Sequence, residues 1–126
     1  MSEQDGCEKL ILVVDDEQTI LRFLKIKLKA SGYEVITTSD GAEALKVCAA
    51  RKPDCMLLDL LMPGMDGFTV LEKLRAFSEI PVIVLSARSG ISDRLSGLGA
   101  SDFVPKPFNP DDLVKRINVA ISHNRK

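Results

Sequence analysis

Apolar and polar residues alternate along the chain in blocks of two kinds. Short apolar runs of strand length occur at residues 10–14, 34–38, 55–58, 81–85 and 102–104. Three of these five runs are apolar nearly throughout, which is typical of strands covered on both faces. Longer segments with helical spacing separate the runs. This alternation predicts parallel βαβ units with right-handed crossovers.

Four of the intervening segments carry an apolar stripe at helical spacing. The stripes are Ile20, Leu21, Leu24 and Leu28; Ala42, Leu45, Cys48 and Ala49; Phe68, Leu71 and Leu74; and Leu113, Ile117, Ala120 and Ile121. Gly32 and Pro53 follow the first two as stop signals. A further helix, fourth in chain order, is weakly specified between about residues 91 and 98 because Gly97 and Gly99 disfavour it. The prediction is a doubly wound α/β fold with a five-stranded parallel sheet.

Length and charge limit what such a fold can do. A chain of 126 residues suits one domain, predicted over residues 9–122, with a flexible leader at 1–8 and a tail at 123–126. The 45% hydrophobic content argues against disorder. Because 17 basic residues face 18 acidic ones, no global basic field favours direct binding of nucleic acid or membrane.

Cysteine and histidine usage points away from disulfide and zinc chemistry. No apolar run reaches the ~18 residues of a membrane span, and the acidic N-terminus is unlike a secretory signal. The three cysteines, Cys7, Cys48 and Cys55, lack metal-binding spacing, and we expect the last two to be buried in a reducing cytosol. With His123 as the single histidine, a zinc site is not expected. We therefore expect a cytoplasmic protein.

The residues that directly follow the strands carry the candidate chemistry. In an open parallel sheet, ligands bind beyond the carboxyl ends of the strands. Asp15 and Asp16, then Glu17, follow the first run, and Asp59 follows the third. Ser86 and Lys106 follow the fourth and fifth runs. We expect these carboxylates, the hydroxyl and the ammonium group to meet at one edge of the sheet.

A cluster of this kind has a plain structural explanation and a chemical one. A single aspartate after a strand is often a helix N-cap, and Asp16 is placed to cap the first helix. Asp15 and Asp16, however, adjoin Asp59 from another strand, and clustered carboxylates repel one another unless a cation lies among them. Oxygen ligands favour a hard ion such as Mg²⁺. With Lys106 and Ser86 alongside, the set describes a phosphoryl site in which one carboxylate attacks.

Four motifs in this order resemble the receiver domain of two-component response regulators over residues 9–122. They are Asp15-Asp16; Asp59 with Met62-Pro63-Gly64-Met65-Asp66-Gly67; Ser86-Ala87; and Lys106-Pro107-Phe108. Residues 81–89 with Ser92-Asp93 are similar to the OmpR class, particularly its potassium-transport regulators. The resemblance implies a flavodoxin-like fold with strand order 2-1-3-4-5. It also implies a signalling protein that assists its own phosphorylation and dephosphorylation, rather than an enzyme.

The resemblance also implies roles for the acidic residues. Asp59 is similar to the phosphoacceptor, which takes a phosphoryl group from a phosphohistidine on a sensor histidine kinase or phosphotransfer protein. Asp16 and Asp59 would bind Mg²⁺ directly, with Mn²⁺ as a substitute. Asp15 would act partly through water, and the backbone carbonyl of Leu61 would complete the protein ligands.

The resemblance implies roles for four further positions in binding the phosphoryl group and responding to it. Ser86 would hydrogen-bond it and Lys106 would pair with it. Phe103 resembles the aromatic switch residue that turns inward when Ser86 moves, and it stands where tyrosine is commoner. Pro107 matches a proline that follows a cis peptide. Ser86 and Lys106 are 20 positions apart (106 − 86), about two fewer than is usual, which predicts a shortened fourth helix.

The implied output is a homodimer formed on phosphorylation through the fourth helix, fifth strand and fifth helix. Asp102 and Arg116 match positions that pair across the two-fold axis of such a dimer; the alternative is that both are solvated surface charges. Two architectures stay open at this point. The chain is either a single-domain regulator or the N-terminal part of a longer protein.

Two other protein classes use similar residues. A phosphatase of haloacid-dehalogenase type also combines aspartates, a hydroxyl, a lysine and Mg²⁺. In that class the acidic pair comes last, whereas Asp15-Asp16 comes first here, and 126 residues leave no cap domain. A flavodoxin-like or dinucleotide-binding protein needs a glycine-rich or hydroxyl-rich loop after the first strand. Without a metal, Asp15-Asp16-Glu17 would repel phosphate there.

Overall fold

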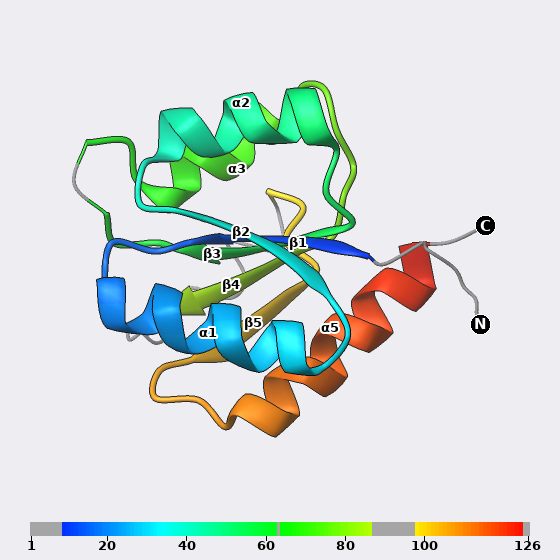
Figure 1. The fold of residues 1–126 in the computed structure, drawn as a ribbon. Coiled ribbons are helices and arrows are strands. Elements are labelled where there is room, and N and C mark those ends of the chain that lie inside the picture. The colour runs from blue at the N-terminus through cyan, green and yellow to red at the C-terminus, as the bar shows by residue number, and fades with distance from the viewer. Residues whose placement is uncertain (1–8, 63, 87–97, 125–126) are drawn as a thin grey trace.

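Five parallel strands form one sheet in the order β2-β1-β3-β4-β5, as predicted (Figure 1). The computed structural model describes residues 9–62, 64–86 and 98–124. Its strands are β1 Leu10–Val14, β2 Glu34–Thr38, β3 Cys55–Asp59, β4 Val82–Ser86 and β5 Asp102–Pro105. Each lies within one residue of its predicted bounds.

In the described residues, four helices cover the two faces of this sheet (Figure 1). They are α1 Gln18–Ala30, α2 Gly41–Arg51, α3 Gly67–Arg75 and α5 Pro110–Asn124. Helices α1 and α5 pack on one face, and α2 and α3 on the other. The predicted fourth helix and its shortening fall largely on residues 87–97, outside the described residues.

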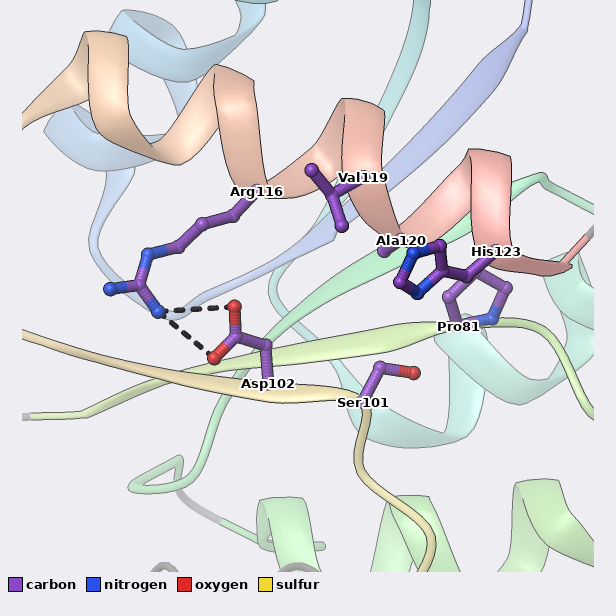
Figure 2. A pocket seen from close by; sticks show the side chains of 7 residues that line it. All are labelled: Pro81, Ser101, Asp102, Arg116, Val119, Ala120 and His123. Carbon is purple, nitrogen blue, oxygen red and sulfur yellow. Dashed lines mark hydrogen bonds and ion pairs between the residues drawn. The ribbon is translucent and has the colours of Figure 1, made fainter.

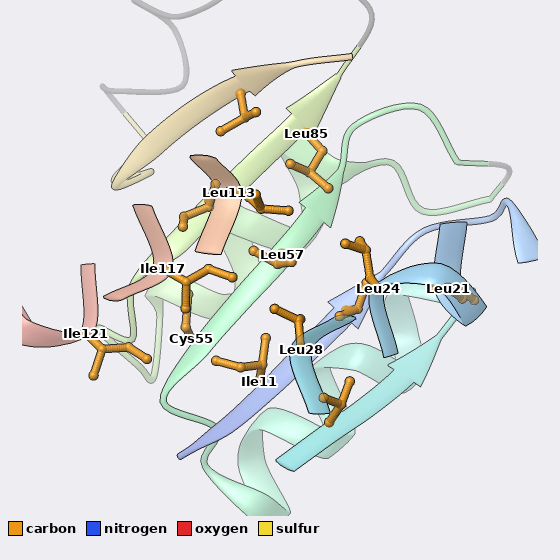
Figure 3. Close-up of a cluster of buried hydrophobic side chains, with 14 residues drawn as sticks. Ile11, Leu21, Leu24, Leu28, Cys55, Leu57, Leu85, Leu113, Ile117 and Ile121 are labelled. Atoms are coloured by element: carbon orange, nitrogen blue, oxygen red, sulfur yellow. The ribbon is translucent and has the colours of Figure 1, made fainter. Parts of the chain in front are cut away.

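The apolar runs of the central strands are explained by this double cover. Along β1, Ile11 and Val13 join the cluster under α1 and α5, whereas Leu12 and Val14 join the cluster under α2 and α3. Figure 3 shows the first cluster, with side chains of α1 and α5 converging on those of the strands. Burying one such side chain stabilises the fold by about 1.5–3 kcal/mol. Strands β1, β3 and β4 are buried along their whole length.

The end of α1 confirms the predicted stop at Gly32. Gly32 has φ +98°, and its N–H donates to the carbonyl of Lys29 at 3.1 Å. The N–H of Tyr33 donates to the carbonyl of Leu28 at 3.0 Å. These two bonds form a Schellman motif, in which glycine adopts the left-handed conformation without strain. The chain therefore turns sharply into β2.

The predicted stripe of α2 is partly wrong. Ala42 and Ala49 are exposed, and the buried positions are Gly41, Ala44 and Cys48. The Asp40 carboxylate caps the helix by accepting the Ala42 N–H at 2.9 Å, so the helix begins at Gly41. A glycine is required there because an added Cβ would lie 2.7 Å from a methyl of Val70 on α3. The close approach of α3 therefore decides which face of α2 is buried.

The two described cysteines are buried, as predicted. Cys48 and Cys55 are free and buried. Burial raises the pKa of the Cys48 thiol to about 11, and burial with the charge of Asp54 raises that of Cys55 to about 12. Both behave as inert small hydrophobes; Cys7 lies outside the described residues. No helix in the described ranges is long and apolar enough to cross a membrane.

Candidate functional site

The carboxyl edge of the sheet brings together the predicted acidic residues. Asp15 directly follows β1 and is fully buried, and Asp59 ends β3 with 5% of its surface exposed. Asp16 is exposed beside them. Carboxylate oxygens of all three lie within 4.8 Å of one another. Aspartates that are 44 positions apart in sequence therefore form one cluster.

Backbone groups hold the two buried carboxylates in place. Asp15 Oδ1 accepts the N–H of Glu17 at 2.9 Å, and Asp59 Oδ1 accepts the N–H of Leu61 at 3.4 Å. The interpretation of Asp16 as a helix cap is wrong. Glu17 occupies the N-cap position of α1, with no side-chain hydrogen bond to the helix. The carboxylate of Asp16 is thus not used as a cap.

Lys106 directly follows β5 and reaches the cluster from there. Its N–H donates to the carbonyl of Ser86 at 2.9 Å, and the peptide bond to Pro107 is cis, as predicted. The ammonium nitrogen Nζ lies 2.9 Å from Asp15 Oδ2 and 3.6 Å from Asp59 Oδ1. It also lies 3.4 Å from Glu17 Oε1.

The contacts of the ammonium group control its charge. Burial acts to lower the pKa of Lys106, but the hydrogen bond to Asp15 and the charges of Asp15, Asp59 and Glu17 outweigh it. The pKa of Lys106 is therefore raised above its ordinary value. Lys106 is a fixed positive charge at neutral pH.

One lysine does not neutralise the acidic residues around it. Burial and the charge of Asp15 raise the pKa of Asp59 to about 6, against the opposing effect of Lys106. Within the described residues, one ammonium group pairs with Asp15, Asp59 and Glu17, and Asp16 lines a hollow together with that group. Their oxygen atoms are the ligands that Mg²⁺ prefers, and their excess negative charge suits a divalent cation. The residues therefore fit the predicted metal site.

The other predicted site residues lie around this cluster. Ser86 ends β4 and is fully buried. Leu61 is half exposed and lines a hollow of about 250 Å³ together with Asp16, Glu17, Asp59 and Lys106. Phe103 is partly buried and packs against the apolar cluster under α2 and α3. The contact of Glu17 with Lys106 was not predicted, although the acidic run at residues 15–17 was its signal.

A second hollow opens beside the first. It measures about 610 Å³ and is mainly apolar, and it is lined by Glu17, Ile20, Phe23, Lys106, Pro107, Phe108 and Pro110. Phe23 on α1 exposes 47% of its surface there. We call this hollow the α1 groove. Glu17 and Lys106 line both hollows and so form the rim between them.

Asp102 and Arg116 lie on a different face and pair with each other. Arg116 Nη1 donates to both carboxylate oxygens of Asp102, at 2.9 and 3.0 Å (Figure 2). Its Nε donates to Asp112 Oδ2 at 2.9 Å. Figure 2 shows this ion pair bridging α5 and β5 beside a small hollow. The pairing predicted across a dimer axis is here made within one chain.

Comparison with known proteins identifies the family. Residues 11–118 match the family model of the response regulator receiver domain. The chain therefore belongs to the receiver domains of two-component response regulators. It is 49% identical over 117 residues to the transcriptional regulatory protein KdpE of Mycobacterium tuberculosis, covering 91% of this chain and 52% of that protein. The probable transcriptional regulator ycf27 of Cyanophora paradoxa is 47% identical, with 87% of this chain and 47% of that protein covered.

These relatives are OmpR-class response regulators, which confirms the predicted class. The chain spans about half the length of the curated relatives it matches. Among solved structures, the receiver domain of the Francisella response regulator 1452 has a TM-score of 0.86 at 32% identity, with 94% of this chain and 100% of that chain covered. The haloacid-dehalogenase alternative finds no support.

Proposed function

We propose that Asp59 accepts a phosphoryl group from a phosphohistidine on a sensor histidine kinase or phosphotransfer protein. The observation that carries the proposal is the position of Asp59. It is a buried carboxylate at the end of a central strand, 3.6 Å from a lysine and inside an acidic cluster. Membership of the receiver family supports the same assignment.

The transfer is a displacement at phosphorus. An Asp59 carboxylate oxygen forms the new bond to phosphorus, while the bond between phosphorus and the imidazole nitrogen of the donor breaks. The electron pair of the broken bond stays on that nitrogen, which then takes a proton. Because such a reaction needs positioning and charge neutralisation rather than covalent help, the surrounding residues stabilise the charge on the transferred oxygens.

The acidic residues would hold the metal ion that this chemistry requires. Asp16, Asp59 and the backbone carbonyl of Leu61 would bind Mg²⁺ directly, with Asp15 acting partly through water, and Mn²⁺ would serve as a substitute. When bound, the cation neutralises negative charge on the phosphoryl oxygens. Asp15 has a second task, since it anchors Lys106 at 2.9 Å beside Asp59.

Lys106 and Ser86 would detect the new phosphoryl group. Lys106 pairs with its oxygens, and the Ser86 hydroxyl donates a hydrogen bond to it. Phe103 follows as the switch, because it lies partly buried on the strand next to the one that carries Ser86. A charge change at Asp59 would thus bias a two-state packing arrangement. The protein works as a signalling phosphoacceptor rather than as an enzyme with a separate substrate.

The α1 groove is the surface that we assign to the phosphodonor protein. A phosphohistidine on a protein reaches Asp59 only if its own surface lies against the rim of the site. The groove shares Glu17 and Lys106 with the site and offers apolar surface from Ile20, Phe23 and Phe108. Exposed apolar surface next to a reactive group is typical of a protein-binding surface.

The output that we propose is dimerisation on phosphorylation. The named relatives are transcriptional regulators about twice as long as this chain, so a receiver of this class would control an attached or separate effector. The dimer face comprises α5, β5 and the predicted fourth helix, with Asp102 and Arg116 able to exchange partners across a two-fold axis. Direct nucleic-acid or membrane binding by this segment is not proposed. The cytoplasmic location stays a prediction.

Phosphorylation in vitro tests the assignment. The chain is incubated with acetyl phosphate and Mg²⁺, and its intact mass is measured. One phosphoryl group should appear on the wild type and none on Asp59→Ala, and EDTA should prevent uptake by the wild type. Normal uptake by Asp59→Ala would disprove the assignment.

A matched control comes from the opposite end of the same strand. Asp54 directly precedes β3, and its Oδ2 accepts the N–H of Leu10 at 2.8 Å. Asp54→Asn changes the same residue type at a distance from the site. It should take up one phosphoryl group as the wild type does, which shows that removing a carboxylate elsewhere in the chain does not prevent uptake.

A further inference from the structure

Glu17 and Lys106 form the rim between the hollow that contains Asp59 and the α1 groove. The first hollow is also lined by Asp16 and Leu61, and the second by apolar residues of α1 and the loop after β5. Glu17 and Lys106 are the two residues common to both linings. Their ion pair of 3.4 Å therefore lies where the reaction site meets the surface assigned to the donor.

Three carboxylates compete for the single ammonium group of Lys106. Asp15 lies at 2.9 Å with 1% of its side chain exposed, and Asp59 at 3.6 Å with 7% exposed. Glu17 lies at 3.4 Å and differs because 57% of its side chain is exposed. Water can solvate the Glu17 carboxylate when Lys106 leaves, whereas a buried carboxylate left alone is costly. Glu17 is therefore the partner that Lys106 releases at the smallest cost.

We propose that Glu17 is a positioning residue for Lys106. It holds the ammonium group at the rim while Asp59 is unmodified, and it releases that group when anionic phosphoryl oxygens arrive at Asp59. The released Glu17 carboxylate then stands unpaired on the rim of the α1 groove. The α1 groove gains negative charge once the transfer is complete. Phosphorylation of Asp59 therefore changes the charge of the surface that bound the donor. This inference rests on the proposed phosphoacceptor role of Asp59.

The expected effect follows from the strength of an exposed ion pair. Glu17→Gln removes one competitor for Lys106 and leaves the side-chain length unchanged. Since exposed ion pairs are worth about 0.2–1 kcal/mol, affinity for a phosphoryl mimic should rise about 1.4- to fivefold. The gain should shrink at high salt because the competing contact is partly exposed.

Calorimetric titration of the whole chain with beryllium fluoride in saturating Mg²⁺ measures this affinity. Glu34→Gln is the matched control. Glu34 is also an exposed glutamate in an ion pair, 3.9 Å from Arg51 and 57% exposed, on the edge strand β2. Glu17→Gln should bind beryllium fluoride more tightly than the wild type, and Glu34→Gln should match the wild type. Separate titrations with Mg²⁺ alone measure any change in metal affinity, so that it is not counted as an effect on Lys106.

A double mutant separates positioning of Lys106 from a general effect of charge. In a Lys106→Met background, Glu17→Gln should no longer change the affinity, because Glu17 acts through Lys106. If Glu17→Gln still raises the affinity by the full amount in that background, Glu17 acts only by electrostatic repulsion of the phosphoryl mimic and the proposal is wrong. If Lys106→Met does not fold, the test instead measures the NMR signal of the Lys106 ammonium group. Glu17→Gln should shift that signal in the free protein and leave it unchanged in the beryllium fluoride complex.

The two proposals fail in different ways. If the wild type binds no beryllium fluoride in Mg²⁺, the phosphoacceptor role of Asp59 is wrong. If the wild type binds it and Glu17→Gln binds it equally well, only the role of Glu17 is wrong. Glu17→Asp supplies a rescue test. Its shorter carboxylate should return the affinity part of the way toward that of the wild type.

Discussion

Two charged clusters in this fold have similar composition and opposite burial. At the carboxyl edge of the sheet, Lys106 lies among the buried Asp15 and Asp59. On α5 and β5, Arg116 lies between Asp102 and Asp112, with 35–50% of those side chains exposed. Counted over the part of the chain that the structure describes, each cluster has one cation and an excess of carboxylates.

Burial makes the difference between these clusters. Water solvates the unbalanced charge around Arg116, and such pairs contribute only about 0–1 kcal/mol each. Around Lys106 the same imbalance raises the pKa of Asp59 to about 6, because burial penalises its charged form and Asp15 repels it. The protein thus keeps electrostatic repulsion at one edge, where a bound cation can relieve it. A charged pattern in sequence therefore becomes a reactive site only where the fold removes water.

Removing the central cation should give the largest difference between the clusters. Lys106→Met leaves the Asp15 carboxylate buried without its ion-pair partner, so unfolding free energy in EDTA should fall by roughly 3 kcal/mol. Arg116→Met leaves solvated aspartates and should cost less than about 1 kcal/mol. Urea denaturation of both variants measures the contrast. Equal losses would show that burial does not distinguish the clusters.

Mg²⁺ should stabilise the buried cluster and leave the exposed one unaffected. A ligand that binds only the folded protein adds about 2.7 kcal/mol at one hundred times its dissociation constant. The melting temperature of the wild type should therefore rise with Mg²⁺ concentration, whereas that of Asp59→Ala should rise much less. Arg116→Met should respond as the wild type does. Thermal scans at constant ionic strength exclude a general effect of salt.

Replacing the acceptor with asparagine should stabilise the metal-free protein. Because the pKa of Asp59 is raised from 3.8 to about 6, its ionisation weakens the fold as the pH rises from about 4 to about 6, and the loss is complete above that range. The full displacement corresponds to roughly 3 kcal/mol, and we expect Asp59→Asn to recover about 1–2 kcal/mol because the amide must also be buried. The gain should be absent below pH 4 and complete above pH 7. Urea denaturation in EDTA across this range measures it; equal stability at pH 7 would contradict a tight carboxylate cluster.

The smallest effect concerns self-association. We expect the unphosphorylated chain to be a monomer or weak dimer, and beryllium fluoride with Mg²⁺ to favour the dimer. Arg116→Glu should weaken that dimer modestly, since each exposed ion pair contributes about 0–1 kcal/mol, although the contact is made twice. Sedimentation velocity of both proteins, with and without the mimic, measures the change. A wild type that stays monomeric with the mimic at high concentration would favour a heterologous protein target.

Periodicity and strand-end position predicted most of the fold and the site. The apolar runs located all five strands because both faces of this sheet are covered, and the strand ends brought Asp15, Asp16 and Asp59 together. The order of the strands came from the family resemblance instead. Apolar periodicity and strand-end position are reliable signals because they depend on backbone geometry, and the backbone allows few ways to connect strands and helices.

The errors involve contacts that backbone patterns do not specify. Alanine is small enough to be tolerated on either side of a helix, so Ala42 and Ala49 did not mark the buried face of α2. The cap of α1 and the side-chain partners of Arg116 and Lys106 were also missed. The contact of Arg116 with Asp112 was missed although the two residues are four positions apart on α5, a spacing that favours such a pair. Lys106 has a long side chain whose partners depend on its neighbours in space, so its contact with Glu17 does not follow from spacing.

Gly67, the first residue of α3, has a mechanical consequence for the acceptor. A Cβ added there would lie 2.8 Å from the carbonyl oxygen of Asp59 and 2.7 Å from Cα of Leu60. The first turn of α3 thus abuts the backbone that carries the acceptor, and that backbone cannot recede toward α3 without collision. If Asp59 accepts a phosphoryl group as proposed, we expect any resulting shift of its backbone to be directed away from α3.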